Sequence, residues 1–408
     1  MENKTVFVMG AGISANLKIP TSEQISDLIH AIDKTNDNLT KLKKILDGTF
    51  GEKKYDINDI FNLIDSNLLL HNALQCKEIK IEYYDLEKCK RDLITYIFKE
   101  FLKKIKTKDT AQYEELVGFY AKLAEKEIYK KFNCDLDFQD REFFISSYSI
   151  INFNWDLYSL LPVIEANSRV NHAINLCFAK GRNPNLRIYT DFNCEYASKG
   201  EDNRYWYPFT ETAAFSVNNP KFDATRRVFL LKCFYPHGAM NLFKCTSCAK
   251  HSYYLGELNL DSVVKKLNYD DNKPLYKCPY CEKEVFSSDF DVLMQSNFKT
   301  RNSFLEEIRL SMTQELRTAK TLVFIGYSMP SDDVDYITMI KSLYCSVENV
   351  FVVLYEDGGE NNFVGYSELS DKAKSKAKNF DKVFKQKAKY NMAGFPTAKS
   401  EILNRISL

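Results

Sequence analysis

The chain has 408 residues, of which 45% are hydrophobic and 14% aromatic, so it can bury a large core in one big domain with insertions or in two domains. Its 56 basic and 55 acidic residues nearly balance, which does not indicate direct nucleic-acid binding. No apolar segment reaches membrane-spanning length, and the apolar stretch at residues 5–9 is too short for a signal peptide. We therefore expect a cytoplasmic protein whose cysteines are thiols or metal ligands.

The first predicted unit is a strand, a glycine turn and a helix. Residues 5–9 predict a short buried strand, which Gly10, Ala11 and Gly12 interrupt. A capping-box pattern at residues 21–24 then predicts the start of a helix. Glycines between a strand and a helix let a phosphate group approach the backbone, but the third glycine of the dinucleotide fingerprint is missing. A tight turn without a ligand is the alternative.

The next segments are a predicted helical insertion and a second strand. Residues 39–142 are rich in lysine and glutamate, with apolar residues at helical spacing and no proline. The strand-like stretch 143–153 then runs directly into Asn154 and Asp156. On an extended chain this amide and this carboxylate point to the same side, where they can hold sugar hydroxyls and a water. The alternative is that Asp156 caps the following helix.

A third strand is predicted at residues 228–235, and it ends at Pro236, His237 and Gly238. A histidine in this position can act as a general acid or base near neutral pH. The proline fixes the path of the chain, and the glycine leaves open space beside the ring. A purely structural histidine is the alternative.

The most specific pattern in the chain is a pair of Cys-x-x-Cys motifs. Cys245 and Cys248 form the first pair, and Cys278 and Cys281 form the second. Four thiolates at this spacing predict a closed tetrahedral zinc site, which is structural because it has no open coordination position. Coincidence or two redox-active pairs are the alternatives, and His251 is a spare candidate ligand.

The final elements expected are a helix, two strands and a tail. Ser303 and Glu306 make a second capping-box pattern before a helix. That helix leads to a strand at residues 321–325, and an apolar strand follows at residues 350–355. Residues 358–408 are predicted as a lysine-bearing tail that is either flexible or available to contact another chain.

The turn after the strand at residues 321–325 is a further candidate site. Gly326 and Ser328 form a small turn with a hydroxyl, and Ser331, Asp332 and Asp333 add a second hydroxyl and two carboxylates. These groups can bind a ribose. Equally, Ser331 or Asp332 can cap the next helix.

Every candidate segment outside the cysteine motifs follows one of five predicted strands, and open parallel sheets bind ligands beyond the carboxyl ends of their strands. We therefore predict an α/β fold, a Rossmann-like doubly wound parallel sheet with a helical insertion and a zinc-ribbon insertion. The predicted boundaries are 1–38, 143–240 and 300–357 for the Rossmann-like domain, 39–142 for the helical insertion, 241–299 for the zinc ribbon, and 358–408 for the tail.

In chain order, these motifs resemble the sirtuin family: a Gly-Ala-Gly-Ile-Ser turn, Asn-x-Asp, His-Gly, two Cys-x-x-Cys pairs and Gly-Tyr-Ser. Members of that family bind NAD in a doubly wound fold beside a zinc ribbon, and the resemblance covers the strand ends across residues 1–355. It implies that Gly10, Ala11, Gly12 and Ser14 hold the phosphates of NAD, Asn154 and Asp156 the nicotinamide ribose, His237 the catalytic base position, and Gly326 and Ser328 the adenosine side.

Two positions depart from the deacylating sirtuins. Those enzymes have glutamine before the asparagine of Asn-x-Asp and an Asp-Phe-Arg run after Ile-Pro, where this chain has Phe153 and residues 21–23. Residues 19–21, residues 56–61 and the GYSMPSDD stretch look more like the sirtuin-like NADases of bacterial antiviral defence. The resemblance to that group implies a homo-oligomer, often beside a partner such as a HerA-type ATPase or an Argonaute protein.

The function implied by this resemblance is NAD hydrolysis to nicotinamide and ADP-ribose. Asn154 would position the ribose or a water, Asp156 would support that geometry, and His237 would take the proton from the attacking water. Two alternatives stay open. One is an NAD-dependent protein deacylase, in which an acyl-lysine oxygen attacks the same carbon. The other is a non-catalytic sensor of NAD or ADP-ribose that acts through a partner.

Overall fold

The computed structural model describes most of the chain. Residue 21 of the first capping box and Ser331 lie outside the described part. The described residues are 4–14, 17, 22–32, 37–105, 110–132, 145–178, 185–198, 226–267, 269, 273–294, 296–298, 301–330 and 332–406.

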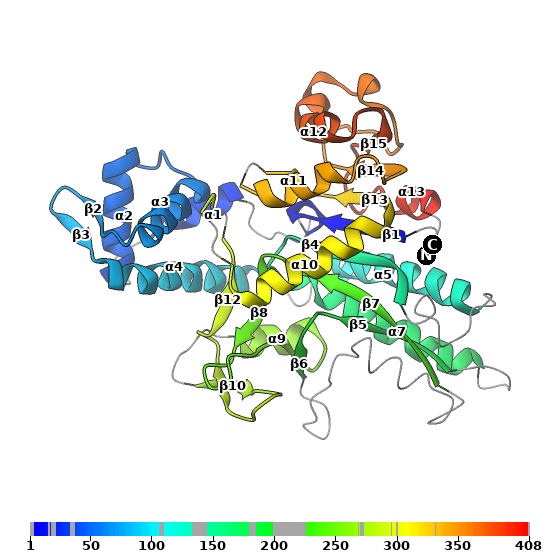
Figure 1. The fold of residues 1–408 in the computed structure, drawn as a ribbon, viewed down its shortest axis with the longest axis horizontal. Coiled ribbons are helices and arrows are strands. Elements are labelled where there is room, and N and C mark those ends of the chain that lie inside the picture. Colours follow the sequence, from blue (N-terminus) through cyan, green and yellow to red (C-terminus); the bar gives the residue numbers. More distant parts are fainter. Residues whose placement is uncertain are drawn as a thin grey trace.

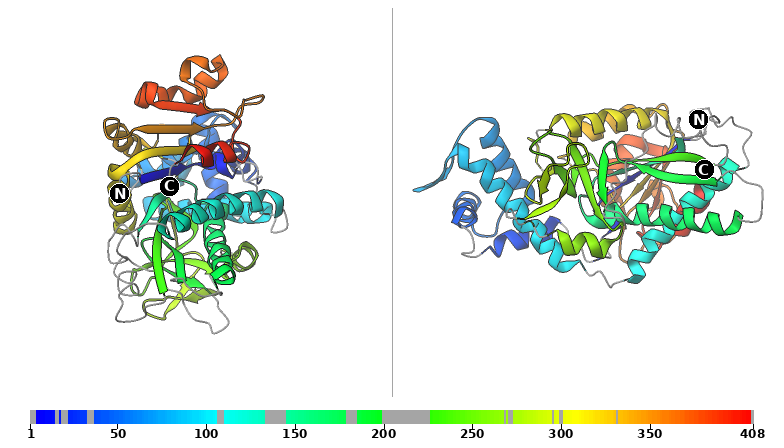
Figure 2. Two further views of the ribbon diagram at one scale, coloured as in Figure 1. Left: turned by 90° about the vertical axis from the view of Figure 1, so that its right-hand side faces the viewer. Right: turned by 90° about the horizontal axis from the view of Figure 1, so that it is seen from below.

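The centre of the molecule is a seven-stranded sheet in which all neighbouring strands are parallel (Figures 1 and 2). Its first strand is buried along its whole length, as expected for a strand covered on both faces by helices. From one edge to the other the order is β15 (Ala388–Asn391), β14 (Asn349–Val353), β13 (Ala319–Ile325), β1 (Lys4–Met9), β4 (Ile145–Asn152), β7 (Arg226–Phe234) and β5 (Asn185–Asp191).

The order of the strands reverses beside β1. The chain passes from β1 to β4 on one side and later returns to β13 on the other side. In open parallel sheets the crevice at such a switch point is where ligands bind. The predicted Rossmann-like doubly wound sheet is therefore confirmed, and the carboxyl ends of β1, β4, β7 and β13 define the region of interest.

Helices cover both faces of the sheet, because right-handed crossovers that run in opposite directions place their helices on opposite faces (Figure 2). The helix α10 packs on β1, while α5 and α7 pack against each other and against β5. None of the helices in the described ranges is both long and apolar enough to cross a membrane. The covering helices are α5 (Thr110–Phe132), α7 (Leu161–Phe178), α10 (Ser303–Thr318), α11 (Val334–Ser342), α12 (Asp371–Phe384) and α13 (Lys399–Arg405).

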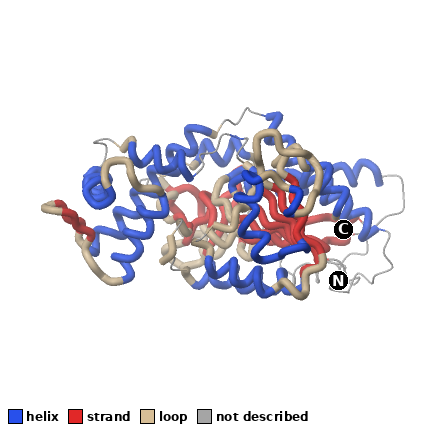
Figure 3. Tube along the Cα trace, turned by 90° about the horizontal axis from the view of Figure 1, so that it is seen from above, coloured by secondary structure: helices blue, strands red, loops and turns tan. Residues whose placement is uncertain are grey.

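A helical module stands to one side of the sheet (Figures 1 and 3). A capping box formed by Asp56 and Asp59 starts one of its helices. The predicted helical insertion at residues 39–142 also includes α5, which packs on the main sheet rather than in this module. The module consists of α1 (Ser22–His30), α2 (Asp37–Phe50), α3 (Ile57–Leu69), the hairpin β2 (Leu74–Cys76) and β3 (Ile79–Ile81), and α4 (Tyr83–Lys104).

The cysteine-rich region forms a second module on a four-stranded sheet. One of its strands, β6, comes from the chain before β7 and pairs in parallel with β9, so the module is tied to the main domain. Its elements are β6 (Glu195–Ser198), β8 (Gly238–Lys244), β9 (His251–Gly256), α9 (Leu260–Lys266), β12 (Phe290–Val292) and the hairpin β10 (Pro274–Lys277) and β11 (Glu284–Phe286).

Two expectations need correction. Residues 358–408 were predicted as a tail, but they form α12, β15 and α13, and β15 extends the main sheet by pairing with β14. The domain predicted to end at residue 357 therefore continues beyond it. The helix α10 begins one residue earlier than a Ser303 cap requires, because Asn302 is the N-cap and its side chain accepts a hydrogen bond from the Leu305 N–H.

A cluster of buried charges lies at the amino ends of the central strands. Lys4 at the start of β1 is 1% exposed, and its ammonium lies 2.6 Å from a carboxylate oxygen of Glu315 on α10. The same ammonium donates a hydrogen bond to the Ser146 carbonyl. Burial lowers the pKa of Lys4, although Glu315 opposes this effect. The pair fastens α10 to the sheet at the end opposite the candidate site.

Candidate functional site

Two glycine turns meet at the switch point. The Gly10 N–H donates a hydrogen bond to the Ile325 carbonyl, and the Gly12 N–H donates to the Gly326 carbonyl, both at 3.0 Å. A Cβ on Gly12 would lie 2.6 Å from the Gly326 Cα. Gly326 has a φ of +63°, and a Cβ there would lie 2.4 Å from the Gly12 Cα. Glycine is required at both positions because no side chain fits between the two backbones.

This contact changes the expected role of the first turn. The amides of Gly10 and Gly12 are bonded to β13 and its turn, and the Ser14 N–H donates to the Ala11 carbonyl within the 3-10 turn η1 (Ala11–Ile13). Ala11 is exposed, whereas Ser14 is buried. The glycines thus allow the two turns to pack closely. Phosphate binding by this segment stays a prediction, and it depends on the exposed Ala11 and the side chain of Ser14.

Ser14 connects the turn after β1 with the turn after β4. Its hydroxyl donates a hydrogen bond to a carboxylate oxygen of Asp156 at 3.0 Å and accepts one from the side-chain amide of Asn154 at 3.4 Å. All three side chains are buried. The Asn154 N–H donates in turn to the side chain of Asn152, the last residue of β4. Residues far apart in the chain therefore form one polar cluster, which we call the Ser14 cluster (Ser14, Asn154 and Asp156).

The structure decides between the two interpretations of Asp156. This residue does precede a helical turn, the 3-10 turn η3 (Leu157–Ser159), but its side chain makes no capping hydrogen bond there. The carboxylate is directed across to Ser14 instead. Helix capping therefore does not account for Asp156, and a buried carboxylate at a switch point is suited to binding hydroxyl groups.

His237 lies between β7 and β8 and is buried. Its Nε2 atom is 3.0 Å from a carboxylate oxygen of Asp333, in the loop after β13. The ring also packs edge-on against Phe153, the residue before Asn154, with 5.2 Å between ring centroids. Gly238 follows with a φ of +73°, and a Cβ there would lie 2.2 Å from the Asp291 carbonyl. The imidazole thus sits beside the Asn154 turn and close to a carboxylate, although its Nε2 atom makes no hydrogen bond of good geometry there.

Asp333 is a site residue whose role sequence reasoning missed. The sequence placed it among groups that bind a ribose or cap a helix, and it is the N-cap of α11 without a capping side-chain bond. Its carboxylate instead accepts a hydrogen bond from the Tyr327 hydroxyl at 2.8 Å and faces His237. A carboxylate soon after a strand end was the available signal, but only the fold shows which side chain it meets.

Three aromatic side chains, Phe153, Tyr327 and Tyr336, pack beside His237. Phe153 stacks on Tyr327 with 4.6 Å between centroids and meets Tyr336 edge-on. Burial raises the pKa of Tyr327 well above its ordinary value, and Asp333 adds to the effect. Burial also raises the pKa of Tyr336 to about 12, against the opposing effect of Arg301. Both hydroxyls donate hydrogen bonds, that of Tyr327 to Asp333 and that of Tyr336 to the Pro236 carbonyl.

The predicted contacts on the adenosine side are the least supported part of the site. Gly326 occupies the turn already described, and Ser328 is exposed at the end of β13. The next residue, Met329, is buried, and its carbonyl accepts a hydrogen bond from the Asn379 side chain on α12. The exposed hydroxyl of Ser328 is accessible to a ligand, but contact with adenosine stays a prediction.

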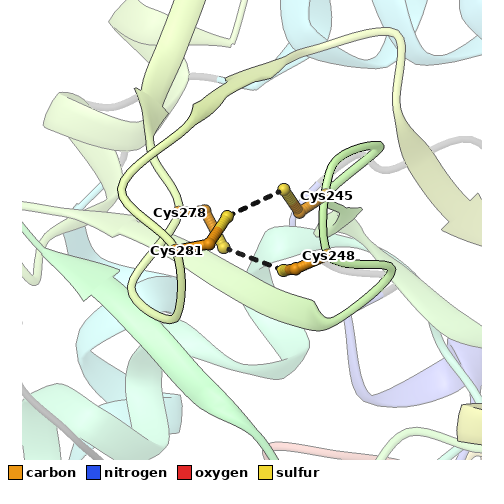
Figure 4. Close-up of side chains that lie close together, drawn as sticks. All are labelled: Cys245, Cys248, Cys278 and Cys281. Carbon is orange, nitrogen blue, oxygen red and sulfur yellow. Dashed lines mark hydrogen bonds between the residues drawn. The ribbon is translucent and has the colours of Figure 1, made fainter.

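The four motif cysteines come together (Figure 4). The Sγ atoms of Cys245 and Cys281 are 3.6 Å apart, and those of Cys248 and Cys278 are 3.7 Å apart. A tetrahedral site with a Zn–S distance of about 2.3 Å has sulfur atoms about 3.8 Å apart. The four thiols therefore fit a tetrahedral zinc ion.

The backbone around the cysteines supports metal binding. Ala249 and Glu282, the residues after each Cys-x-x-Cys pair, both have a positive φ, and their N–H groups donate back to the carbonyls of Cys245 and Cys278. Burial alone would raise the pKa of Cys245, but backbone N–H groups donate to its sulfur and lower the pKa to about 7. Thiolates are the form that binds zinc.

His251 is not part of the cysteine cluster. Its Nε2 atom lies 2.7 Å from a carboxylate oxygen of Asp291, and its ring stacks on Phe304 with 4.5 Å between centroids. The first contact lies within the cysteine-rich module, and the second joins that module to α10. The histidine proposed as a spare ligand has a structural role instead.

Comparisons with known proteins give a remote likeness. A Sir2 homologue in complex with NAD has 11% sequence identity and a TM-score of 0.34, covering 99% of this chain and 89% of that one. A structure of a Sir2 enzyme solved for mechanism and regulation has 10% identity and a TM-score of 0.39, over 99% and 92%. A Sir2 protein bound to an acetylated peptide has 13% identity and a TM-score of 0.33, over 99% and 91%. No protein-family model and no curated protein matches the chain.

Proposed function

We propose that the chain binds NAD at the switch point beside β1 and hydrolyses the bond between nicotinamide and ribose, releasing nicotinamide and ADP-ribose. The observation that carries this proposal is the Ser14 cluster, in which Ser14 joins Asn154 and Asp156 across two strand ends. Its groups match the sirtuin-like motifs in type and order. Because the structural likenesses are remote, the proposal rests on the chain's own residues.

The roles of the residues follow from their chemistry. Loss of nicotinamide builds positive charge on the ribose, and the buried carboxylate of Asp156 is suited to stabilising that charge and the ribose hydroxyls. The Asn154 amide is placed to orient the ribose or the attacking water. His237 would accept the proton of that water, with Asp333 holding the imidazole in position.

The position of Phe153 favours hydrolysis over deacylation as the main activity. Deacylating sirtuins have glutamine there, whereas in this chain an apolar ring is stacked between Tyr327 and the histidine. The ring offers no hydrogen bond to a substrate. A protein deacylase remains the second candidate, and release of nicotinamide that depends on an added acyl-lysine peptide would favour it.

We further propose that the protein works in an assembly, as the resemblance to bacterial antiviral NADases implies. The helical module supports this because it exposes large apolar side chains: Leu69 and Leu70 at the end of α3 are 59% and 65% exposed, and Tyr84 on α4 is 76% exposed. Such residues are typical of a contact surface for a second copy of the chain or a partner such as a HerA-type ATPase. Size-exclusion chromatography with and without the partner tests this point.

The test of the proposed activity is release of nicotinamide from NAD, followed by chromatography, with the purified chain alone and with its partner. Asn154→Ala and His237→Ala should abolish release while circular dichroism stays unchanged. Matched controls are Asn362→Ala and His71→Ala, two exposed positions outside the site. Unchanged turnover in both site variants would overturn the assignment. Saturable NAD binding without products in every condition would instead identify a sensor.

A further inference from the structure

A cavity of about 320 Å³ opens between α7 and the edge strand β5, away from the Ser14 cluster. Its innermost lining residues are the buried side chains of Asn167, Ile188, Thr190 and Phe192. Ligand pockets in proteins have volumes of about 300–1,000 Å³, so this cavity suits a small molecule rather than a dinucleotide. None of the residues assigned to NAD lines it.

The side-chain amide of Asn167, in the cavity lining, makes only part of its possible hydrogen bonds. Asn167 is 4% exposed, and its amide nitrogen donates a hydrogen bond to the Thr190 hydroxyl at 2.9 Å. Its carbonyl oxygen has no hydrogen-bond partner. If the amide is turned over, the oxygen takes the Thr190 hydroxyl and the nitrogen loses its partner, so one end of the amide is unpaired either way. A buried amide with one unpaired end gains a hydrogen bond from a ligand group when its side chain turns toward the cavity.

The rest of the lining contains aromatic and basic side chains. Tyr189, Phe192 and Tyr196 offer flat apolar surfaces. Arg187 and the exposed His172 supply basic groups, and the Arg187 side chain is held by a hydrogen bond to the Asn171 carbonyl at 2.7 Å. The described residues that line the cavity include no aspartate or glutamate. An anion with a planar ring matches this arrangement.

We propose that this cavity binds a small anion with a planar nitrogen-containing ring, the chemistry of a nucleoside monophosphate. The ring packs against the aromatic side chains, and a polar group on its edge pairs with the Asn167 amide. The phosphate faces Arg187 and His172 at the mouth. This site is separate from the proposed NAD site and does not depend on the proposed activity.

The test is isothermal titration calorimetry of the full chain with AMP, repeated with adenosine and with inorganic phosphate. AMP should bind saturably, and adenosine and phosphate should each bind at least tenfold more weakly, because each retains only half of the recognised groups. Ser168→Tyr, at an exposed position that lines the cavity, should block the mouth and weaken AMP binding at least tenfold. Ala173→Tyr, an exposed position on the same helix outside the lining, should bind AMP like the unmodified chain.

A second pair of variants tests the amide. Asn167→Leu should weaken AMP binding at least tenfold, whereas Asn241→Leu should not. Asn241 is a matched control because it is also buried with one amide hydrogen bond and an unpaired oxygen, but it does not line this cavity. Failure of AMP, GMP, CMP and UMP to bind would overturn the proposal. So would AMP binding that Asn154→Ala removes and Ser168→Tyr leaves unchanged, since AMP would then occupy the proposed NAD site.

Discussion

Replacing Asp333 by asparagine tests whether the carboxylate holds His237 for catalysis. Asp333 is 2% exposed, and one of its oxygens lies 3.0 Å from the imidazole Nε2. A polar contact with a charged group contributes about 1.5–3 kcal/mol. At about 1.4 kcal/mol per tenfold in rate, losing it should lower nicotinamide release about 10- to 150-fold. Asparagine has the same shape and can still accept the Tyr327 hydroxyl, so the fold should survive.

The measurement is the kcat and KM of nicotinamide release at saturating and limiting NAD. The matched control is Asp335→Asn, the same exchange two residues later, where the side chain is 61% exposed and pairs with Arg301, which is 14% exposed. This control should keep nearly full activity. If Asp333→Asn turns over NAD at the normal rate, or if both variants lose activity equally, the carboxylate does not position the histidine.

Three further predictions concern parts of the fold that support the site. Cys278→Ser should release the zinc measured by mass spectrometry, whereas Cys345→Ser, an exposed cysteine outside the cluster, should retain it; equal zinc content in both variants would contradict the metal site. Gly326→Ala should cost about 2–5 kcal/mol of unfolding free energy in urea, from backbone strain plus overpacking against Gly12. Gly358 has a similar φ but open space around it, so Gly358→Ala should lose only the free energy of backbone strain. Equal losses of unfolding free energy in the two variants would exclude a clash between residues 326 and 12. Glu315→Gln should cost about 3–5 kcal/mol by removing the negative charge that faces the buried Lys4 ammonium. The unfolding entropy of 408 residues is about 0.9 kcal/mol per degree, so Tm should fall by about 3–6 °C. The control is Glu348→Gln, because Glu348 is exposed and pairs with Lys320 at the surface, so its Tm should hardly change. Equal Tm shifts in the two variants would contradict the role of burial.

The parts of the fold that sequence reasoning predicted are those with a strong local signal. The strand β1 is a short apolar run that stops at glycine, and the cysteine motifs have a spacing typical of zinc ribbons. Polar residues directly after strands then converge because parallel strands share a carboxyl edge. That rule predicts that the strand-end segments meet, and Ser14, Asn154 and Asp156 do come together in the structure.

The features that were missed depend on contacts between distant segments. The strand β15 has the sequence Ala-Lys-Tyr-Asn, which has no apolar run, and it becomes a strand by pairing with β14 at the sheet edge. The sequence indicates that the amides of Gly10 and Gly12 are available for phosphate, but they donate hydrogen bonds to the carbonyls of Ile325 and Gly326. The role of Asp333 likewise depends on a histidine that lies elsewhere in the chain.

The backbone contact between Gly12 and Gly326 restricts which amino-acid substitutions these two positions can accept. Two positions separated by more than three hundred residues must both keep a hydrogen atom where other residues have a side chain. A side chain at either position would clash with the backbone of the other. We therefore expect both glycines to be retained together in related sequences. The same contact passes any shift of one turn directly to the other, which links the loop that carries Ser14 with the loop that carries Asp333.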